Sequence, residues 1–355
     1  MLDWTSSMHQ TFEYYVVDPG TWRDARKING VISCTINRDS TAETLGYATF
    51  DIAEPLGECY VRVYLIAIQN GIKEKHPLGT FLVQTPLSGF DGKTVAVSID
   101  TYTPLLELKE KMPPIGYYIP ESQNILEYAY LLARENARAP VVKGKCDETI
   151  FYDFVADTDD TWLSYLTDLL ANAKYKFSLD EMGRILFAPD QDTASLQAVW
   201  TFDDNNSSIL YPDLSLEHDL YGIPNVVEVV YSDSDEYYHA RVVNDDPNSP
   251  ISTVNRGREI LYREVDPNFI GDPTENQVHE RAKQLLRELS TLEYTVTYTH
   301  GYCPVRLGDC VRLNYSRAKA VGMNGVKAKV ISQSIKCEPG CPVTEKAVFT
   351  NKLWR

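Results

Sequence analysis

Four of the seven cysteines lie in the last sixth of the sequence and raise the question of a metal site: Cys303, Cys310, Cys337 and Cys341. A zinc ribbon needs thiolate pairs whose members are two to four residues apart. Six residues separate Cys303 from Cys310, and Cys310 occupies an expected strand position that suits a buried apolar side chain. The spacing favours buried or hairpin-tip thiols, and we predict no metal and no cofactor.

Two acidic clusters have the composition of calcium loops, at residues 157–160 (DTDD) and 203–206 (DDNN). Neither has the glycine at the sixth place and the distal glutamate that an EF-hand loop requires. The first cluster also falls where an expected helix needs an N-terminal cap. We therefore interpret both as loop and capping residues.

The six histidines are widely scattered: His9, His76, His218, His239, His279 and His300. The sequence contains no HExxH, no GxSxG, no P-loop and no glycine-rich dinucleotide fingerprint. We therefore predict that the protein is not an enzyme and name no catalytic or ligand-binding residue. A carbohydrate-binding or peptidoglycan-degrading β-protein stays open as an alternative, because carboxylate pairs come from distant strands and the 23 tyrosines suit sugar platforms as well as protein interfaces.

The chain is acidic, with 50 Asp and Glu against 34 Lys and Arg and a net charge of −16 spread along its whole length. No segment forms a basic platform for phosphates, so tight nucleic-acid binding is disfavoured. Like charges repel, and an acidic surface is therefore compatible with DNA that passes by without binding.

Length and composition predict a multi-domain soluble protein. A chain of 355 residues suits two to four domains, and 43% apolar with 24% charged residues is ordinary for a globular protein. There is no apolar run long enough for a membrane helix and no secretory signal. The odd number of scattered cysteines favours assembly in a reducing cytoplasm.

The first part of the chain predicts an antiparallel β-domain. Alternating or β-branched strand patterns occur near residues 12–16, 28–35, 47–52 and 59–68. Arg62 and Tyr64 alternate with Val61, Val63 and Leu65, as an exposed face alternates with a core face.

The stretch Leu78 to Lys111 adds a hairpin, with strands at residues 80–83 and 94–99 and turn residues Gly89, Asp91 and Gly92, followed by a short helix. Its pattern, "lGtF.V" followed by "dG.t..v...D...lL...k", resembles the first tube domain of phage baseplate or tail hub proteins. That family includes late-control proteins and the hub portion of type VI secretion spikes. The resemblance extends from residue 28 to residue 111.

Residues 112–200 predict a different, smaller α+β domain. One helix is expected after Pro120, a second is expected from Asp159 or Asp160 with a carboxylate cap, and a hairpin follows at residues 175–187. A helix followed by "y.f.lDe.G.i.F.p" is similar to the middle domain of the hub family.

From Trp200 the chain returns to strands, with one long helix expected from an Asp272 cap. The loop at residues 245–258 resembles the family's "N.dp.SpiS....gr", and residues 304–313 resemble its "p.l..GD.V.l". The predicted fold is therefore α+β and mostly β, with two antiparallel β-barrel-like tube domains (1–111 and 201–355) flanking the middle domain (112–200). Strands near residues 200–235 are candidates to complete the first tube domain.

The resemblance implies a structural hub, a homotrimer whose ring joins the hexameric tail tube to the central spike or tail tip in the baseplate of a virion assembled in the host cytoplasm. Implied partners are the tube protein, the spike or tip protein, other baseplate proteins and the tape-measure protein, with DNA passing through the lumen. A tail-tip protein of a long flexible tail is the alternative within the same class. We expect Arg62, Tyr64 and Ile66 at a subunit or ring interface.

Overall fold

The computed structural model describes residues 2–53, 56–90, 95–191, 193–205, 208–232, 237–267, 269, 273–315 and 323–354. The chain divides into two compact units. Unit 1 comprises Met1–Leu214 and Thr297–Ala347, and unit 2 comprises Ser215–Val296 and Val348–Arg355. The expected division into residues 1–111, 112–200 and 201–355 stays a prediction.

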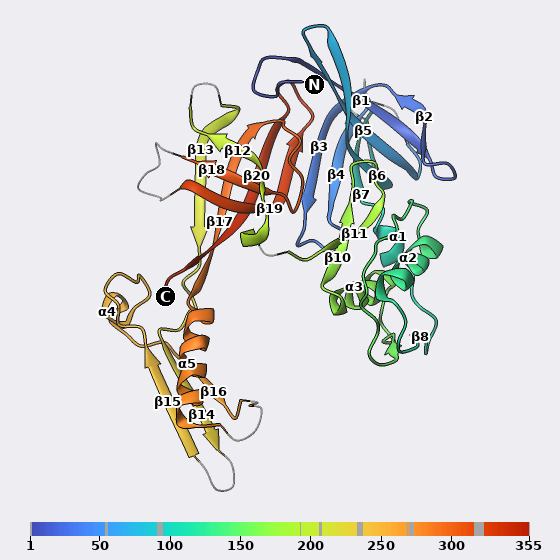
Figure 1. Ribbon diagram of the computed structural model, residues 1–355. Coiled ribbons are helices and arrows are strands. Elements are labelled where there is room, and N and C mark those ends of the chain that lie inside the picture. The colour runs from blue at the N-terminus through green and yellow to red at the C-terminus, as the bar shows by residue number, and fades with distance from the viewer. Residues whose placement is uncertain are drawn as a thin grey trace. The chain divides into compact units, whose positions relative to one another are not determined.

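One large sheet, most of it in unit 1, dominates the fold (Figure 1). Its strands are β1 (His9–Asp18), β2 (Arg23–Ile28), β3 (Val31–Asp39), β4 (Gly46–Ile52), β5 (Cys59–Gln69), β6 (Ile72–Phe90), β7 (Val95–Tyr102), β12 (Ala198–Asp203), β13 (Leu210–His218), β17 (Thr291–Gly301), β18 (Cys310–Asn314), β19 (Asn324–Lys336) and β20 (Pro342–Lys352). The strand order is β13-β17-β20-β19-β3-β4-β7-β6-β5-β1-β2, and β18 joins β12 to β19. The predicted mostly β, α+β class is confirmed, but within the described residues the strand order is open and closes no barrel.

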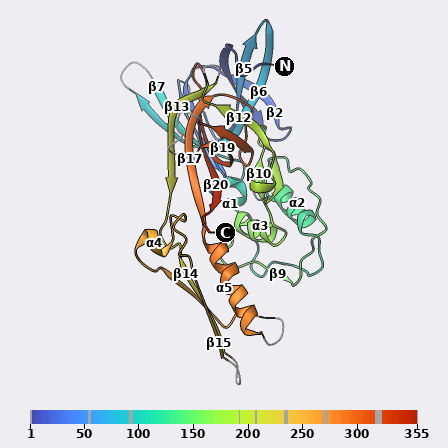
Figure 2. The same ribbon diagram turned by 60° about the vertical axis from the view of Figure 1, so that its left-hand side comes forward.

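The early and late parts of the chain share this sheet through β3 and β19, which pair antiparallel with Ile36 opposite Ile335. Both isoleucines are buried in the same hydrophobic core, with side chains from β4, β5, β6 and β20. Figures 1 and 2 both place β19 beside the blue N-terminal strands. The core of unit 1 is therefore built from segments at both ends of the sequence.

The hairpin expected between residues 78 and 111 is present. Strands β6 and β7 pair antiparallel from Leu82 opposite Tyr102 to Phe90 opposite Val95. Of the predicted turn residues, Gly89 belongs to β6, and Asp91 and Gly92 lie outside the described residues. The short helix α1 (Leu106–Lys109) follows, as predicted.

The segment 112–200 forms a helical cluster with its own core. Its elements are β8 (Tyr118–Ile119), α2 (Ile125–Asn136), β9 (Phe154–Val155), α3 (Trp162–Asn172), β10 (Tyr175–Leu179), β11 (Ile185–Pro189) and the 3₁₀ turn η1 (Thr193–Ser195). The expected carboxylate cap of α3 is wrong. Thr161 caps the helix in a reciprocal capping box with Ser164, and Asp160 accepts a hydrogen bond from the Ser164 hydroxyl (2.8 Å).

A row of polar side chains, all buried except the partly buried Arg38, crosses four neighbouring strands of the sheet. Glu345 on β20 is fully buried and accepts hydrogen bonds from the Tyr298 hydroxyl (2.5 Å) and the Gln333 amide (2.6 Å). The Gln333 amide oxygen in turn accepts from Arg38 on β3 (2.9 Å), and His300 Nε2 lies 3.4 Å from the Glu345 carboxylate. We call these five residues the buried polar row.

The buried polar row keeps Glu345 ionised. Burial by itself raises the pKa of this carboxyl group, but the adjacent His300 imidazole and the hydrogen bonds from Tyr298 and Gln333 outweigh burial and hold the pKa below its ordinary value of 4.5. A buried charge is tolerated only when it is paired and hydrogen-bonded, and here the partners come from β17 and β19.

Unit 2 consists of a small sheet and one long helix. Its elements are β14 (Val226–Ser232), β15 (Tyr237–Val243), α4 (Thr253–Arg256), β16 (Leu261–Val265) and α5 (Glu275–Leu289). Strand β14 lies between β15, which is antiparallel, and β16, which is parallel. Helix α5 buries Val278, Ala282, Leu285 and Leu286 against one face of the sheet.

Local sequence explains the helix ends of unit 2. The N-cap of α5 is Thr274, in a capping box with Gln277, whereas the expected cap Asp272 lies outside the described residues. In the loop that resembled a family motif, Ser252 caps α4 and Gly257 ends it in the left-handed region (φ 63°), which favours glycine. No helix within the described residues has the length and apolar character needed to cross a bilayer.

Removal of the Glu345 carboxylate tests the buried polar row. We expect Glu345→Ala to lower the free energy of unfolding by about 3–5 kcal/mol, because it leaves several buried polar partners unpaired. Urea denaturation measures the change. The matched control Glu338→Ala removes an exposed carboxylate and stays within about 0.5 kcal/mol of the parent. Equal effects of the two substitutions contradict the role of the row.

The pH dependence of stability provides a second test. Because the folded-state pKa of Glu345 is lowered, its contribution is complete above about pH 4.5, the unfolded value, and is lost as the pH falls through the folded value. Below pH 4.5 the parent protein therefore loses stability more steeply than Glu345→Gln. Parallel slopes in a urea titration across this range exclude Glu345 as the titrating group.

Candidate interface surfaces

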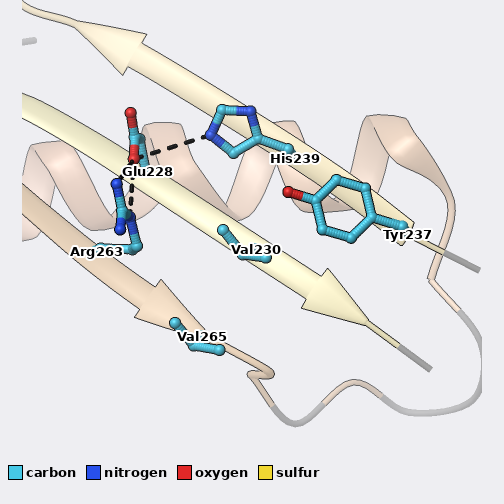
Figure 3. A pocket seen from close by; sticks show the side chains of 6 residues that line it. All are labelled: Glu228, Val230, Tyr237, His239, Arg263 and Val265. Carbon is cyan, nitrogen blue, oxygen red and sulfur yellow. Dashed lines mark hydrogen bonds and ion pairs between the residues drawn. The ribbon is translucent and has the colours of Figure 1, made fainter.

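The uncovered face of the unit 2 sheet is the first candidate surface. Alternate residues of β14, such as Val227 and Val229, face α5, so Glu228 and Val230 face the other side. The exposed side chains Tyr237 (67%), Val265 (60%) and Leu261 (46%) belong to this open face. Figure 3 shows Glu228, Val230, Tyr237, His239, Arg263 and Val265 on it, where they line a shallow depression of about 370 Å³.

Glu228 is the electrostatic centre of the open face. It lies directly opposite Arg241 of β15 and Arg263 of β16 in the strand register. Arg263 Nη2 is 2.8 Å and His239 Nε2 3.9 Å from its carboxylate (Figure 3). Arg241 Nε is 3.4 Å from the same carboxylate. The hydrogen bond from Arg263 lowers the pKa of Glu228.

This arrangement suits protein contact better than catalysis. A carboxylate that is held ionised between two arginines is a poor proton acceptor at neutral pH, so Glu228 does not have the properties of a general base. Exposed apolar side chains that gather on one face, as Tyr237, Leu261 and Val265 do here, mark interaction sites instead. No group of three or more potential ligands among the described residues is placed to hold a metal ion, and this includes the four cysteines considered above.

The ends of the large sheet are the second candidate surface. Strand β2 ends the strand order on one side and β13 ends it on the other, so each has one edge without a strand partner among the residues that the structure describes. Unpaired edges are templates for strand addition. β2 carries Arg23, Arg26 and Lys27, whereas β13 carries Asp213 and Glu217. The two edges are therefore opposite in charge.

The three residues expected at an interface, Arg62, Tyr64 and Ile66, are buried on β5, with exposed fractions of 1%, 6% and 2%. The prediction of an exposed face for Arg62 and Tyr64 is wrong, because Asp24, the β10–β11 turn and the Tyr15 ring lie against them. Both donate to the Asp24 carboxylate of β2, at 2.9 Å from Arg62 Nη1 and 2.8 Å from the Tyr64 hydroxyl. Their assignment to an interface stays a prediction, and they support edge strand β2 from within the chain.

Arg62 also joins the sheet to the β10–β11 turn. It donates to the Met182 carbonyl (3.1 Å), which also accepts from the Trp22 indole (2.7 Å). The next residue, Gly183, has φ +74° and lies so close to Thr80 that a Cβ would be 2.6 Å from the Thr80 Cβ. Only glycine fits this close approach without displacement of the turn.

Sequence reasoning missed the open face of unit 2 and the role of Asp24. The alternation of Glu228 with Val227 and Val229 is a signal that distinguishes this face, and His239 and Arg241 alternate in the same way with Ala240. No local signal identifies Asp24, because its partners come from another strand.

The structure is similar over nearly its whole length to solved tail proteins. A tail protein from Neisseria meningitidis MC58 has 13% identity and a TM-score of 0.61, with 96% of this chain and 97% of that chain covered. The 43 kDa tail protein of prophage MuSo2 from Shewanella oneidensis has 12% identity and a TM-score of 0.60, with 95% and 98% covered. A chain of the Francisella PdpA-VgrG complex has 10% identity and a TM-score of 0.54, with 97% of this chain and 53% of that chain covered.

No family model and no curated protein matches the sequence. The structural similarity therefore defines a class by fold: the chain has the fold of solved tail proteins, one of them from a prophage, and shares it with a chain of the Francisella PdpA-VgrG complex. The resemblance to the tail hub family is confirmed at the level of the fold.

Replacement of Arg62 tests its internal role. We expect Arg62→Met to lower the free energy of unfolding by about 3 kcal/mol, since it removes the partner of Asp24 and the bond to the Met182 carbonyl. Urea denaturation gives the value, and the exposed Lys73→Met serves as control with a change below about 0.5 kcal/mol. A variant with parental stability and weakened self-association assigns Arg62 to the subunit interface instead.

Replacement of Glu228 tests the centre of the open face. We expect Glu228→Gln to cost about 1 kcal/mol, because two cross-strand ion pairs are lost and two arginines on neighbouring strands lose the charge between them. Glu259→Gln, which removes one exposed partner of Arg241, costs less. The protection of the β14 amides from hydrogen exchange measures the loss of stability in both variants. A larger loss for Glu259→Gln contradicts the central position of Glu228.

Proposed function

We propose that this protein is a structural hub of a phage tail or a related injection device, in which three copies form a ring between the tail tube and the spike or tail tip. The observation that carries the proposal is the fold match to tail proteins, which covers nearly all of both chains. The protein acts through geometry and not through catalysis. Its partners are the tube protein, the spike or tip protein and other baseplate proteins, and DNA passes through the ring without specific binding.

The open ends of the large sheet support a ring. A contact between two different surfaces of identical subunits produces a closed ring when the rotation allows it. Strand β13 of one copy and β2 of the next are such a pair of surfaces, each with an unpaired edge. Addition of one to the other extends the sheet across the subunit boundary.

The charges of the two edges support this pairing. Asp213 and Glu217 of β13 have no ion-pair partner among the described residues of their own chain, although both side chains are exposed. Arg23 and Arg26 of β2 are exposed as well. The contact of a basic edge with an acidic edge also disfavours the alternative pairings β2 with β2 and β13 with β13.

The molar mass in solution is the first test of the ring. We expect a trimer with three times the 40.2 kDa mass of one chain by light scattering, and a central hole in averaged electron micrographs. A monomer at all concentrations up to about 100 μM, in the absence and presence of the tail tube, contradicts the proposal.

Charge reversal tests the contact between β2 and β13. We expect Arg23→Glu/Arg26→Glu to weaken trimer formation by at least about tenfold, because both edges then carry negative charge. Asp213→Lys/Glu217→Lys in the same chain restores it, since the signs are again opposite.

The matched control is Lys73→Glu/Lys336→Glu, which makes the same change in net charge at exposed positions away from these two edges. If the control weakens the trimer as much as the β2 variant, general charge repulsion explains the effect. If the second pair of substitutions fails to restore the trimer, the edge of β2 meets a different surface.

A further inference from the structure

An exposed apolar surface lies on the segments around β8 and β9 of unit 1. We call it the β8–β9 surface. Its side chains and their exposed fractions are Met112 (56%), Ile115 (93%), Tyr118 (52%), Phe151 (80%), Tyr152 (74%) and Val155 (60%). Single exposed apolar residues are ordinary, but six of them on two paired segments mark an interaction site.

The backbone that carries these side chains is fixed. Tyr118 pairs with Val155 and Ile119 with Phe154 in an antiparallel ladder. On either side of this ladder, Ala156 N donates to the Tyr117 carbonyl (2.9 Å) and Ser122 N to the Ile150 carbonyl (2.7 Å). The two segments therefore present their outer side chains from a preformed frame, which lowers the entropy cost of binding.

The inner side chains of the same segments are fully packed in the core of unit 1. Tyr117 and Phe154 pack on the ring of Tyr165, with centroids 5.8 and 4.9 Å apart, and the Tyr165 hydroxyl donates to the Phe154 carbonyl (2.7 Å). Ile119 and Ile150 are buried beside them. The core of the cluster is complete without the outer side chains, so their apolar character is not required by the packing of unit 1.

Acidic residues surround the surface. Exposed carboxylates on the same two segments are Glu121, Asp147, Glu148, Asp153, Asp157 and Asp159. None of these six has an ion-pair partner among the described residues. Of the nearby basic residues, Lys111 donates to the Asn136 carbonyl and Lys143 pairs with Glu127, which leaves Lys145 beside the six carboxylates. The surface therefore has an apolar centre and an unneutralised acidic rim.

From this combination we infer that the β8–β9 surface docks a protein segment with apolar anchor side chains flanked by Lys or Arg. Apolar anchors fill the space around Phe151 and Tyr152, where aromatic side chains supply large contact areas, and the basic flanks neutralise the rim. The same surface of a second copy is disfavoured as the occupant, because its own acidic rim repels this rim. The inference is independent of the proposed ring, since it involves neither β2 nor β13.

Binding of two designed peptides to the full chain tests the inference. One peptide of 14 residues combines Leu at helical spacing with Lys elsewhere, and the other has Glu in place of Lys. We expect the Lys peptide to bind in calorimetry, to protect amides of residues 117–125 and 148–156 from hydrogen exchange, and to bind more weakly at high salt. The Glu peptide shows no binding.

A double variant identifies the site. We expect Phe151→Ser/Tyr152→Ser to lower the affinity for the Lys peptide by at least about tenfold. Thermal stability stays unchanged, because both side chains are exposed. The control Val254→Ser removes an apolar side chain of similar exposure (61%) in unit 2 and leaves the affinity unchanged.

Three outcomes overturn the inference. The first is absence of Lys-peptide binding up to about 100 μM. The second is equal affinity of the Lys and Glu peptides. The third is binding that persists in the double variant or protects other segments, which indicates attraction to the acidic chain as a whole. If the double variant still forms a trimer, the proposed ring stands even when one of these outcomes overturns the inference about the β8–β9 surface.

Discussion

The fold of unit 1 depends on one buried carboxylate. Glu345 of β20 lies fully buried between β17 and β19, and Gln333 connects it to Arg38 of β3. A charge in that position is stable only when its partners are all in register. A shift of β20 by one residue turns Glu345 to the opposite face and leaves Tyr298 and Gln333 without their acceptor. Apolar contacts between β-branched residues tolerate alternative registers far better. The buried polar row therefore specifies which strands pair and in which register, beyond what the hydrophobic core requires.

Arg62 performs a related task near the edge of the sheet. Its guanidinium group reaches Asp24 of β2, Thr80 of β6 and the Met182 carbonyl of the β10–β11 turn, so three segments are oriented by one side chain. The planar group of arginine presents donors in fixed directions, which a lysine cannot reproduce. Edge strand β2 is held in place by these bonds while its outer edge stays unpaired. An edge that is fixed by its own chain is well prepared to accept a strand from a neighbour.

Local patterns predicted the elements well, because they depend on neighbours in sequence. The strands β1 and β5, the helices α2, α3 and α5, and the hairpin of β10 and β11 follow from periodicity and turn residues. The burial and the contact partners of individual side chains were harder to predict, because they depend on segments distant in the sequence. Arg62 and Tyr64 alternate with apolar residues like a solvent face, yet Asp24 and Met182 cover them. His300 looked isolated, and its partner Glu345 lies on another strand. Strands β16 and β20 carry too many polar residues for alternation to identify them.

The pairing of β3 with β19 has a consequence for the order of folding during synthesis. The core around Ile36 stays incomplete until the residues around Ile335 have left the ribosome, because the partner strand does not exist before then. Contacts between such distant segments also form slowly, since a long loop must close first. The helical cluster of residues 112–200 relies on contacts near in sequence and is able to form earlier. On a nascent chain, strands β1 and β2 and the exposed edge of β2 are therefore present before the sheet is complete. Premature contact between neighbouring nascent chains is a hazard at this stage, and the negative charge of the chain opposes it.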